Sequence, residues 1–356
     1  MIRRIFKTVL RAVSSWFRRP AREPEGKLYK GSHSAFGRSF ALVQFTSGRR
    51  PYLLYLPKSY SAAKRLPMVV MLHGCRQDAD TFAHVTRMNG IADRDNFLVL
   101  YPEQRRLANS LRCWNWFSRS AQTGAGEAAI LADMIRSIAD EYGVDMERVY
   151  VAGLSAGAAM ANNLAVCHAE LFAACALHSG VAFAAATSSH QAIKAMRDGA
   201  RHEALETGRR AFIQSRGKTE EIPALVIQGD ADEVVNPVNA RQVAAQFAVL
   251  NELLAEQARS QTGAPREKIS TINTSATYPY EITDILRGGR VLIRKIIVSG
   301  LGHAWSGGAE DYQYSDPRGP NGSELICDFF AEHGLRETPS HREAGGSSEP
   351  DRVTPS

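Results

Sequence analysis

The segment RVYVAGLSAGA at residues 148–158 constrains the fold more than any other part of the chain. A short run of strand-favouring residues, Val-Tyr-Val at 149–151, leads into the pentapeptide GLSAG, which carries Ser155, and an alanine-rich run follows. A G-x-S-x-G between a strand and a helix is typical of a sharp turn that presents the serine at the helix N-terminus. The simpler alternative is a glycine-rich turn that carries a serine by chance, and the rest of the chain decides between the two.

Apolar runs with the length of buried strands alternate with helical stretches along the chain. The expected buried strands are 68–72, 97–101, 149–151, 172–177, 225–227 and 291–298, and the expected helices are 79–94, 126–142, 239–256 and 321–333. Continuous apolar runs are typical of strands that are covered on both faces. This alternation predicts an α/β fold with a mostly parallel central sheet and helices on both faces. Two further β segments, 40–45 and 50–56, are expected to form an edge hairpin.

Composition divides the chain into three parts. Residues 1–34 are expected to form a basic amphipathic arm and a linker, and residues 35–335 to form a catalytic domain. Residues 336–356 are rich in Ser, Pro, Glu and Arg, which predicts a disordered tail. Within the domain, the polar and helix-prone stretch 183–221 is interpreted as a cap or an insertion, and 260–277 as a polar insertion.

The basic charge of the chain is concentrated in the arm. The formal net charge is +6, but seven of the 43 Lys and Arg residues lie within residues 1–22, where no acid occurs. The remaining bases are nearly balanced by the 37 acids, which argues against nucleic acid as a partner of the domain. No apolar run is long enough to span a bilayer.

Residues 1–17 carry apolar side chains at helical spacing opposite the basic ones. The apolar positions are Ile2, Ile5, Phe6, Val9, Leu10, Val13, Trp16 and Phe17. This pattern predicts a basic amphipathic helix that can lie on an anionic or apolar surface. A signal peptide is a competing interpretation, although Arg11 interrupts the apolar region and no clear cleavage site follows. A helix docked on the domain and a disordered arm are also open.

The candidate catalytic residues follow predicted strands in the order Ser155, an acid, then His303. A serine hydroxyl needs an imidazole to take its proton, and the imidazole needs an acid to fix its tautomer. His303 follows the last buried strand, and both Asp230 and Asp232 follow the strand at 225–227. We prefer Asp232, because it lies one turn beyond the strand end and two following valines would pack its loop, and we expect Asp230 to brace the turn. The order is that of α/β-hydrolases.

The oxyanion hole is expected to use the backbone N–H groups of Cys75 and Ala156. Cys75 as the nucleophile of a thiol enzyme is an alternative, but Ser155 explains more of the chain. The five cysteines form no C-x-x-C pair and no zinc spacing, and neither a metal nor a cofactor is expected. Cys75 and Cys113 both lie near predicted active-site loops, so a disulfide between them is a hypothesis for an exported protein.

Two of the four tryptophans, Trp114 and Trp116, lie in a loop rich in Ser, Arg and Gly, outside any periodic pattern. Two interpretations are open. The rings form either a local packing cluster or an aromatic wall that contacts substrate.

These segments together resemble the poly(3-hydroxybutyrate) depolymerase family of esterases, which also includes feruloyl and acetyl-xylan esterase-like members. The matching segments are LHGC at 72–75, YPEQ at 101–104, CWNW at 113–116, GLSAG at 153–157, Gly229 with Asp232, and GHAW at 302–305. The similarity covers about residues 40–334. It implies an α/β-hydrolase fold and ester hydrolysis through an acyl-enzyme, with Ser155, Asp232 and His303 as catalytic residues and an oxyanion donor at Cys75.

The resemblance also makes Trp114, Trp116 and Trp305 candidates for contact with an apolar substrate. We therefore expect a serine carboxylic-ester hydrolase that acts on short-chain polyhydroxyalkanoate or related hydroxyacyl esters, either polymeric or small. A feruloyl or acetyl-xylan-type esterase is the alternative, and a surface-binding scaffold on a hydrolase fold is the non-enzyme alternative. The resemblance implies an extracellular protein, whereas the unclear signal sequence leaves a cytoplasmic, granule-associated location open.

Overall fold

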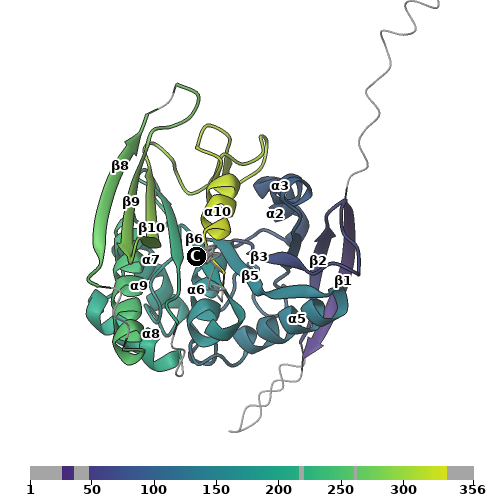
Figure 1. Cartoon of the computed structure of the whole chain (residues 1–356), viewed down its shortest axis with the longest axis horizontal. Helices are drawn as coiled ribbons and strands as arrows, with labels where there is room; N and C mark the ends of the chain where they lie inside the picture. The colour runs from purple at the N-terminus through teal and green to yellow at the C-terminus, as the bar shows by residue number, and fades with distance from the viewer. Residues whose placement is uncertain (1–25, 36–47, 216–219, 260–262, 274, 335–356) are drawn as a thin grey trace, which may run out of the picture.

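The computed structural model describes residues 26–35, 48–215, 220–259, 263–273 and 275–334. The predicted arm at 1–17, the predicted strand at 40–45 and the predicted tail at 336–356 lie outside these ranges. Within them, a ten-stranded sheet forms the centre of the molecule, and helices cover both of its faces (Figure 1).

The strand order in the sheet is β1-β2-β4-β3-β5-β6-β7-β10-β9-β8. The bounds are β1 Lys27–Ala35, β2 Gly48–Leu56, β3 Leu66–Leu72, β4 Leu98–Pro102, β5 Val144–Leu154, β6 Ala174–His178, β7 Ala224–Gly229, β8 Arg266–Ile272, β9 Tyr280–Arg287 and β10 Arg290–Val298. The central run from β4 to β10 is parallel, and antiparallel strands extend the sheet at both ends. The short strands β11 Trp305–Ser306 and β12 Ser315–Asp316 pair separately.

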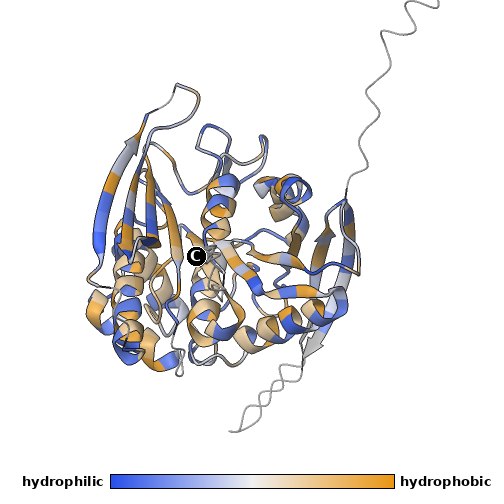
Figure 2. Cartoon of the chain, viewed as in Figure 1, coloured by the Kyte–Doolittle hydropathy of each residue, from blue (hydrophilic) through white to orange (hydrophobic). Residues whose placement is uncertain are grey.

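The central strands are buried on both faces, as their apolar sequences predict. All residues of β4, β6 and β7 are buried, and so are the last five residues of β3. The side chains that alternate along these strands feed two separate hydrophobic clusters, one on each face of the sheet. Figure 2 shows the apolar residues gathered along the central strands and along the helices that cover them.

The helices form two layers. One cluster contains residues of α5 Glu127–Tyr142, α6 Ala156–Cys167 and α9 Val238–Gln257, and the other contains residues of α2 Ala79–Thr86, α3 Met88–Asp95 and α10 Gly322–Ala331. The short helices α4 Arg119–Gln122 and η1 Ala169–Leu171 connect longer elements. The single helix predicted at 79–94 is divided at Arg87, whose φ of 53° ends α2. No helix in the described ranges is long and apolar enough to cross a membrane.

The predicted linker was wrong for its last residues, because 27–35 form β1. This strand pairs with β2 in antiparallel register from Lys27 opposite Leu56 to Ala35 opposite Gly48. Its sequence, KLYKGSHSA, contains no apolar run, because β1 is an edge strand and the side chains of residues 27–30 are exposed. Edge strands with charged side chains are common, since such residues block pairing with another sheet.

The polar stretch at 260–277 was also interpreted wrongly, because it contains β8. This strand is the other edge of the sheet, and it pairs with β9, a strand that is not among those expected from the apolar runs. Six of its seven residues are exposed, so its composition resembles that of a loop.

The stretch 183–221 contains two helices, α7 Ser189–Asp198 and α8 Ala204–Gln214. Helix α8 packs against α9 and α6. Helices α8 and α9 come so close together that a Cβ atom at Gly208 in α8 would lie 2.5 Å from the side chain of Val249 in α9. These helices therefore extend the layer that contains α6 and α9, and the cap remains a prediction.

Candidate active site

Ser155 lies at the junction between β5 and α6, in a strained backbone conformation. Its φ is 56° and its ψ is −119°, values that a residue with a side chain rarely adopts. The turn is tight on both sides: a Cβ atom at Gly153 would lie 2.5 Å from the Gly157 carbonyl carbon, and one at Gly157 would lie 2.0 Å from the Leu72 oxygen. Glycines two residues before and two after the serine are therefore required by the close approach of backbone.

The structure brings Ser155, His303 and Asp232 together in a continuous hydrogen-bonded chain. His303 Nε2 lies 3.1 Å from Ser155 Oγ, and His303 Nδ1 lies 2.8 Å from Asp232 Oδ2. The three residues follow β5, β10 and β7, whose carboxyl ends lie at one edge of the sheet. This is the edge at which open α/β sheets bind ligands.

Asp232 is buried and its carboxylate is fully engaged. Oδ1 accepts hydrogen bonds from the N–H groups of Val234 and Val235 at 2.9 and 2.8 Å, and Oδ2 accepts one from Gln228 Nε2 at 2.9 Å besides the contact with His303. Burial opposes ionisation, but the hydrogen bond and charge of His303 and the two backbone N–H groups hold the pKa of Asp232 below its usual value. The side chain is therefore a fixed acceptor for His303 Nδ1–H.

Asp230, the competing acid, makes a different contact. Its Oδ1 accepts the Gly300 N–H at 2.6 Å, which ties the loop after β7 to the loop after β10. A Cβ atom at Gly229 would lie 2.0 Å from the Leu301 oxygen, so the two loops pack backbone to backbone. Asp230 thus braces the loops that carry Asp232 and His303.

The loop after β3 lies directly beside the serine. A Cβ atom at Gly74 would lie 3.7 Å from Ser155 Cβ, so the next residue, Cys75, starts at the edge of the site. Cys75 is bonded to Cys113, which confirms the predicted disulfide. Among the described residues, the Cys75 N–H meets no hydrogen-bond acceptor. The Ala156 N–H belongs to the first turn of α6, where N–H groups have no partner within the helix.

Two buried histidines, His73 and His178, brace this edge of the sheet. His73 Nε2 accepts the Gln104 N–H at 3.1 Å, so its proton is on Nδ1 and is donated to the Gly74 oxygen at 2.8 Å. His178 Nε2 accepts the Ser306 N–H at 3.2 Å. Burial lowers the pKa of His73 to about 4 and that of His178 to about 3, so both rings are neutral at neutral pH.

The three tryptophans lie in the hydrophobic core, which does not support the aromatic wall. Trp114 and Trp305 are fully buried, and Trp116 is 4% exposed. Trp114 Nε1 donates to the His73 oxygen, and Trp305 stacks on His178 while its Nε1 donates to a serine hydroxyl. Trp114 and Trp116 belong to the hydrophobic cluster on one face of the sheet and Trp305 to the cluster on the other face. For Trp114 and Trp116, this burial favours the local packing that the sequence left open.

Sequence reasoning missed several residues that contact the candidate triad or its loops. The Gln228 amide binds Asp232, and the Tyr314 ring lies edge-on to His303 with ring centroids 6.1 Å apart. Gln228 is a polar residue within the apolar strand β7, a signal that could have marked it. Glu127 offered no such signal, because its partners are distant in the sequence. Within the described ranges, no group of three His, Cys, Asp or Glu side chains is arranged to hold a metal ion.

Comparison with known proteins places most of the described residues in a family of esterases. Residues 50–271 match the family model described as esterase PHB depolymerase. Poly(3-hydroxyalkanoate) depolymerase C of Paucimonas lemoignei is 32% identical over 213 residues, which are 58% of this chain and 51% of that protein. Feruloyl esterase B of Neurospora crassa is 30% identical over 218 residues, which are 59% of this chain and 73% of that protein. The match therefore spans about half the length of the depolymerase.

A probable acetylxylan esterase A of Neosartorya fischeri is 30% identical over 215 residues, 58% of each protein. The solved structure of an acetyl xylan esterase from Aspergillus awamori has a TM-score of 0.64 at 21% identity, over 85% of this chain and 99% of that one. This likeness shows a shared fold and confirms the predicted α/β-hydrolase architecture. Because the family model covers more than half of its residues, the chain belongs to the esterase PHB depolymerase family.

Proposed function

We propose that the protein is a serine carboxylic-ester hydrolase in which Ser155, His303 and Asp232 form the catalytic triad. The observation that carries this proposal is the hydrogen-bonded chain from Ser155 Oγ through His303 to the buried carboxylate of Asp232, at 3.1 and 2.8 Å. Membership of an esterase family supports an ester as the substrate.

The proposed reaction has two halves. In the first, His303 Nε2 takes the Ser155 proton as Oγ attacks the ester carbonyl, and then returns that proton to the leaving alcohol. In the second, His303 activates a water molecule that hydrolyses the acyl-enzyme. Asp232 keeps the His303 proton on Nδ1, which leaves Nε2 free to act as the base.

The negative charge that develops on the carbonyl oxygen is stabilised by the backbone N–H groups of Cys75 and Ala156. The support for this assignment is the position of the Gly74 backbone against Ser155 and the location of Ala156 at the first turn of α6. The α6 N-terminus adds the positive end of a helix dipole. Removing one such donor from a hydrolase typically costs about 10²–10³ in kcat.

The proposed substrate is a short-chain polyhydroxyalkanoate or a related hydroxyacyl ester. The similarity to a protein named poly(3-hydroxyalkanoate) depolymerase C supports this class. Two relatives named feruloyl esterase B and acetylxylan esterase A support a second candidate, an aromatic or acetyl ester of a plant polysaccharide. For a granule or membrane surface as partner, the support is the basic amphipathic pattern of residues 1–17.

The test is turnover of an ester panel by the purified protein, with Ser155→Ala as the blank. The panel contains p-nitrophenyl butyrate, amorphous polyhydroxybutyrate, methyl ferulate and acetylated xylan. Hydrolysis of the first two, with little release of ferulate or acetate, supports the preferred substrate class. Efficient ferulate or acetate release would shift the assignment to the second candidate. Equal rates for wild type and blank would leave only the surface-binding scaffold.

A further inference from the structure

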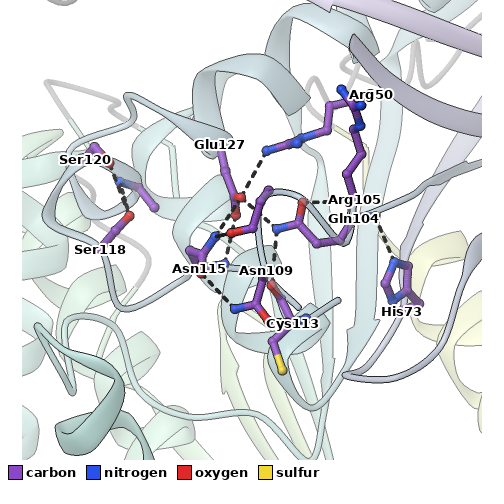
Figure 3. Close-up of polar contacts among 12 residues, drawn as sticks. Arg50, His73, Gln104, Arg105, Asn109, Cys113, Asn115, Ser118, Ser120 and Glu127 are labelled. Carbon is purple, nitrogen blue, oxygen red and sulfur yellow. Dashed lines mark hydrogen bonds and ion pairs between the residues drawn. The ribbon is translucent and has the colours of Figure 1, made fainter. Parts of the chain in front are cut away.

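Glu127, the first residue of α5, is a carboxylate at the centre of a polar cluster (Figure 3). The cluster extends to His73, the first residue of the loop after β3, which also carries Cys75 and is called the oxyanion loop below. It accepts four hydrogen bonds: from Gln104 Nε2 at 2.7 Å, from the Asn115 N–H at 2.8 Å, from Asn115 Nδ2 at 2.9 Å and from the Arg50 guanidinium at 3.0 Å. Its side chain is 11% exposed. A carboxylate that accepts this many bonds in a nearly buried position fixes the segments that donate them.

The donors to Glu127 come from strand β2 and from two points of the connection between β4 and α4. Arg50 lies in β2, Gln104 follows β4, and Asn115 lies in the loop that carries Cys113. The Arg50 side chain is buried too, and burial lowers its pKa although the charge of Glu127 raises it. Removing the carboxylate would leave a buried cation without its counter-charge, so the local structure must shift.

A first path runs from Glu127 to the oxyanion loop through Gln104. The Gln104 amide holds Glu127 and also donates to the Cys113 oxygen at 3.2 Å, and the Gln104 backbone N–H donates to His73 Nε2 at 3.1 Å. His73 in turn donates to the Gly74 oxygen at 2.8 Å. The Gly74 carbonyl and the Cys75 N–H belong to the same planar peptide group. This chain of hydrogen bonds therefore orients the Cys75 N–H, the proposed oxyanion donor.

A second path runs through the loop at 113–115. Glu127 binds both the backbone and the side chain of Asn115, and Trp114 Nε1 donates to the His73 oxygen at 3.0 Å. Cys113 is covalently bonded to Cys75. Glu127 is therefore connected to the Gly74–Cys75 peptide group in two ways, through hydrogen bonds and through the disulfide.

We propose that Glu127 is a positioning residue for the oxyanion hole, which aligns the Cys75 N–H through Gln104–His73 and through the disulfide loop. The inference rests on the proposed function of Ser155. An oxyanion donor acts only when it lies about 2.7–3.1 Å from the charged oxygen. A shift of the Cys75 peptide thus reduces the stabilisation of the transition state. It leaves substrate binding nearly intact, because this N–H contributes less to the ground state. The expected signature is a lower kcat with little change in KM.

The experiment compares wild type with Glu127→Gln, which keeps the side-chain shape but removes the charge. Turnover of p-nitrophenyl butyrate gives kcat and KM, and titration with a fluorophosphonate counts the sites that react. The inhibition constant of butylboronic acid, which forms a tetrahedral adduct on serine, reports the oxyanion hole. We expect kcat per titrated site to fall about 10- to 100-fold, less than the loss of a whole donor. KM should change less than threefold. The inhibition constant of butylboronic acid should rise by about the same factor as kcat falls.

Asp284→Asn is the matched control, because it removes the charge from a partly buried ion pair with Arg294, between β9 and β10, whose residues are not part of the Glu127 network. Its kcat should stay within twofold of wild type even where its melting temperature falls as far as that of Glu127→Gln. If Glu127→Gln does not fold, Gln104→Met carries the test, because it removes the amide link to Glu127 and Cys113 but retains the backbone bond to His73. It should show the same linked changes in kcat and boronate affinity.

Three results would overturn the inference. One is a Glu127→Gln protein, or in its absence a Gln104→Met protein, with wild-type kcat per titrated site. Another is a kcat loss without weaker boronate binding. The third is an equal kcat loss in Asp284→Asn. Failure of the proposed function looks different, because wild type itself would then neither turn over the ester nor react with the fluorophosphonate, and the inference would fall with it.

Discussion

Acid should destabilise this protein well above the pH at which its carboxylates protonate, because His73 and His178 are buried as neutral rings. Both accept a backbone N–H on Nε2 and cannot gain a proton there without losing that bond. Burial lowers the pKa of His73 to about 4 and of His178 to about 3, whereas an exposed histidine in the unfolded chain titrates near 6.5. As pH falls below 6.5, the unfolded chain therefore binds protons before the folded one.

The size of the effect follows from these pKa values. Each histidine contributes stability that is fully present above pH 6.5 and is lost by about 1.4 kcal/mol per pH unit as the pH falls toward its folded pKa. Between pH 7 and pH 4.5, the two rings together should remove about 5 kcal/mol from the free energy of unfolding. His333, whose pKa burial also lowers to about 3, acts in the same direction. Carboxylates with lowered pKa values, such as Asp232, act at lower pH.

The assay is urea unfolding at half-unit steps from pH 7.5 to pH 4.5, followed by tryptophan fluorescence. His178→Gln is the informative variant, because it removes one titrating ring and retains a side-chain acceptor for the Ser306 N–H. Its free energy of unfolding should be lower at pH 7 but should depend less on pH, by about 1.4 kcal/mol per unit. A wild-type curve that is flat from pH 6.5 to pH 4.5, or a variant with the wild-type slope, would refute the reasoning.

Three further predictions concern the site and the arm. Asp232→Asn should lower kcat about 10⁴-fold because the His303 tautomer is no longer fixed, whereas Asp230→Asn should retain most activity; the reverse result in p-nitrophenyl butyrate assays would exchange their roles. Cys113→Ser, which opens the bond to Cys75, should lower the free energy of unfolding by about 2–4 kcal/mol in urea titrations, and an unchanged midpoint would contradict this. Deletion of residues 1–22 should abolish cosedimentation with polyhydroxybutyrate granules but spare turnover of the soluble ester, and unchanged sedimentation would remove the arm from the account.

The central part of the fold was predictable because buried parallel strands have a plain sequence signature. β3, β4 and β7 are apolar throughout or nearly so, and each is followed by polar residues of the candidate site. Since parallel strands end at the same edge, Ser155 and His303 could be expected to meet although they are far apart in the chain. The edge strands β1 and β8 could not be found in this way, because exposed strands carry the same polar residues as loops.

The tryptophans and Glu127 were hard to interpret from the sequence for a different reason. A tryptophan outside a periodic pattern has the same sequence signal whether its ring faces substrate or, like Trp114, is buried with its N–H bonded to a backbone oxygen. Glu127 was missed because helix first turns often carry an acid that faces solvent, and nothing local shows that Arg50 and Gln104 converge on it. Such clusters depend on tertiary contacts between segments that are distant in sequence.

The most direct test of the central claim is to label the full-length protein with a fluorophosphonate and map the modified peptide by mass spectrometry. The proposed triad predicts one modified residue, Ser155, with loss of p-nitrophenyl butyrate turnover in proportion to labelling. His303→Ala should then react far more slowly, because Ser155 would lack its base. Label on a different residue, or full ester turnover after stoichiometric modification of Ser155, would contradict the account.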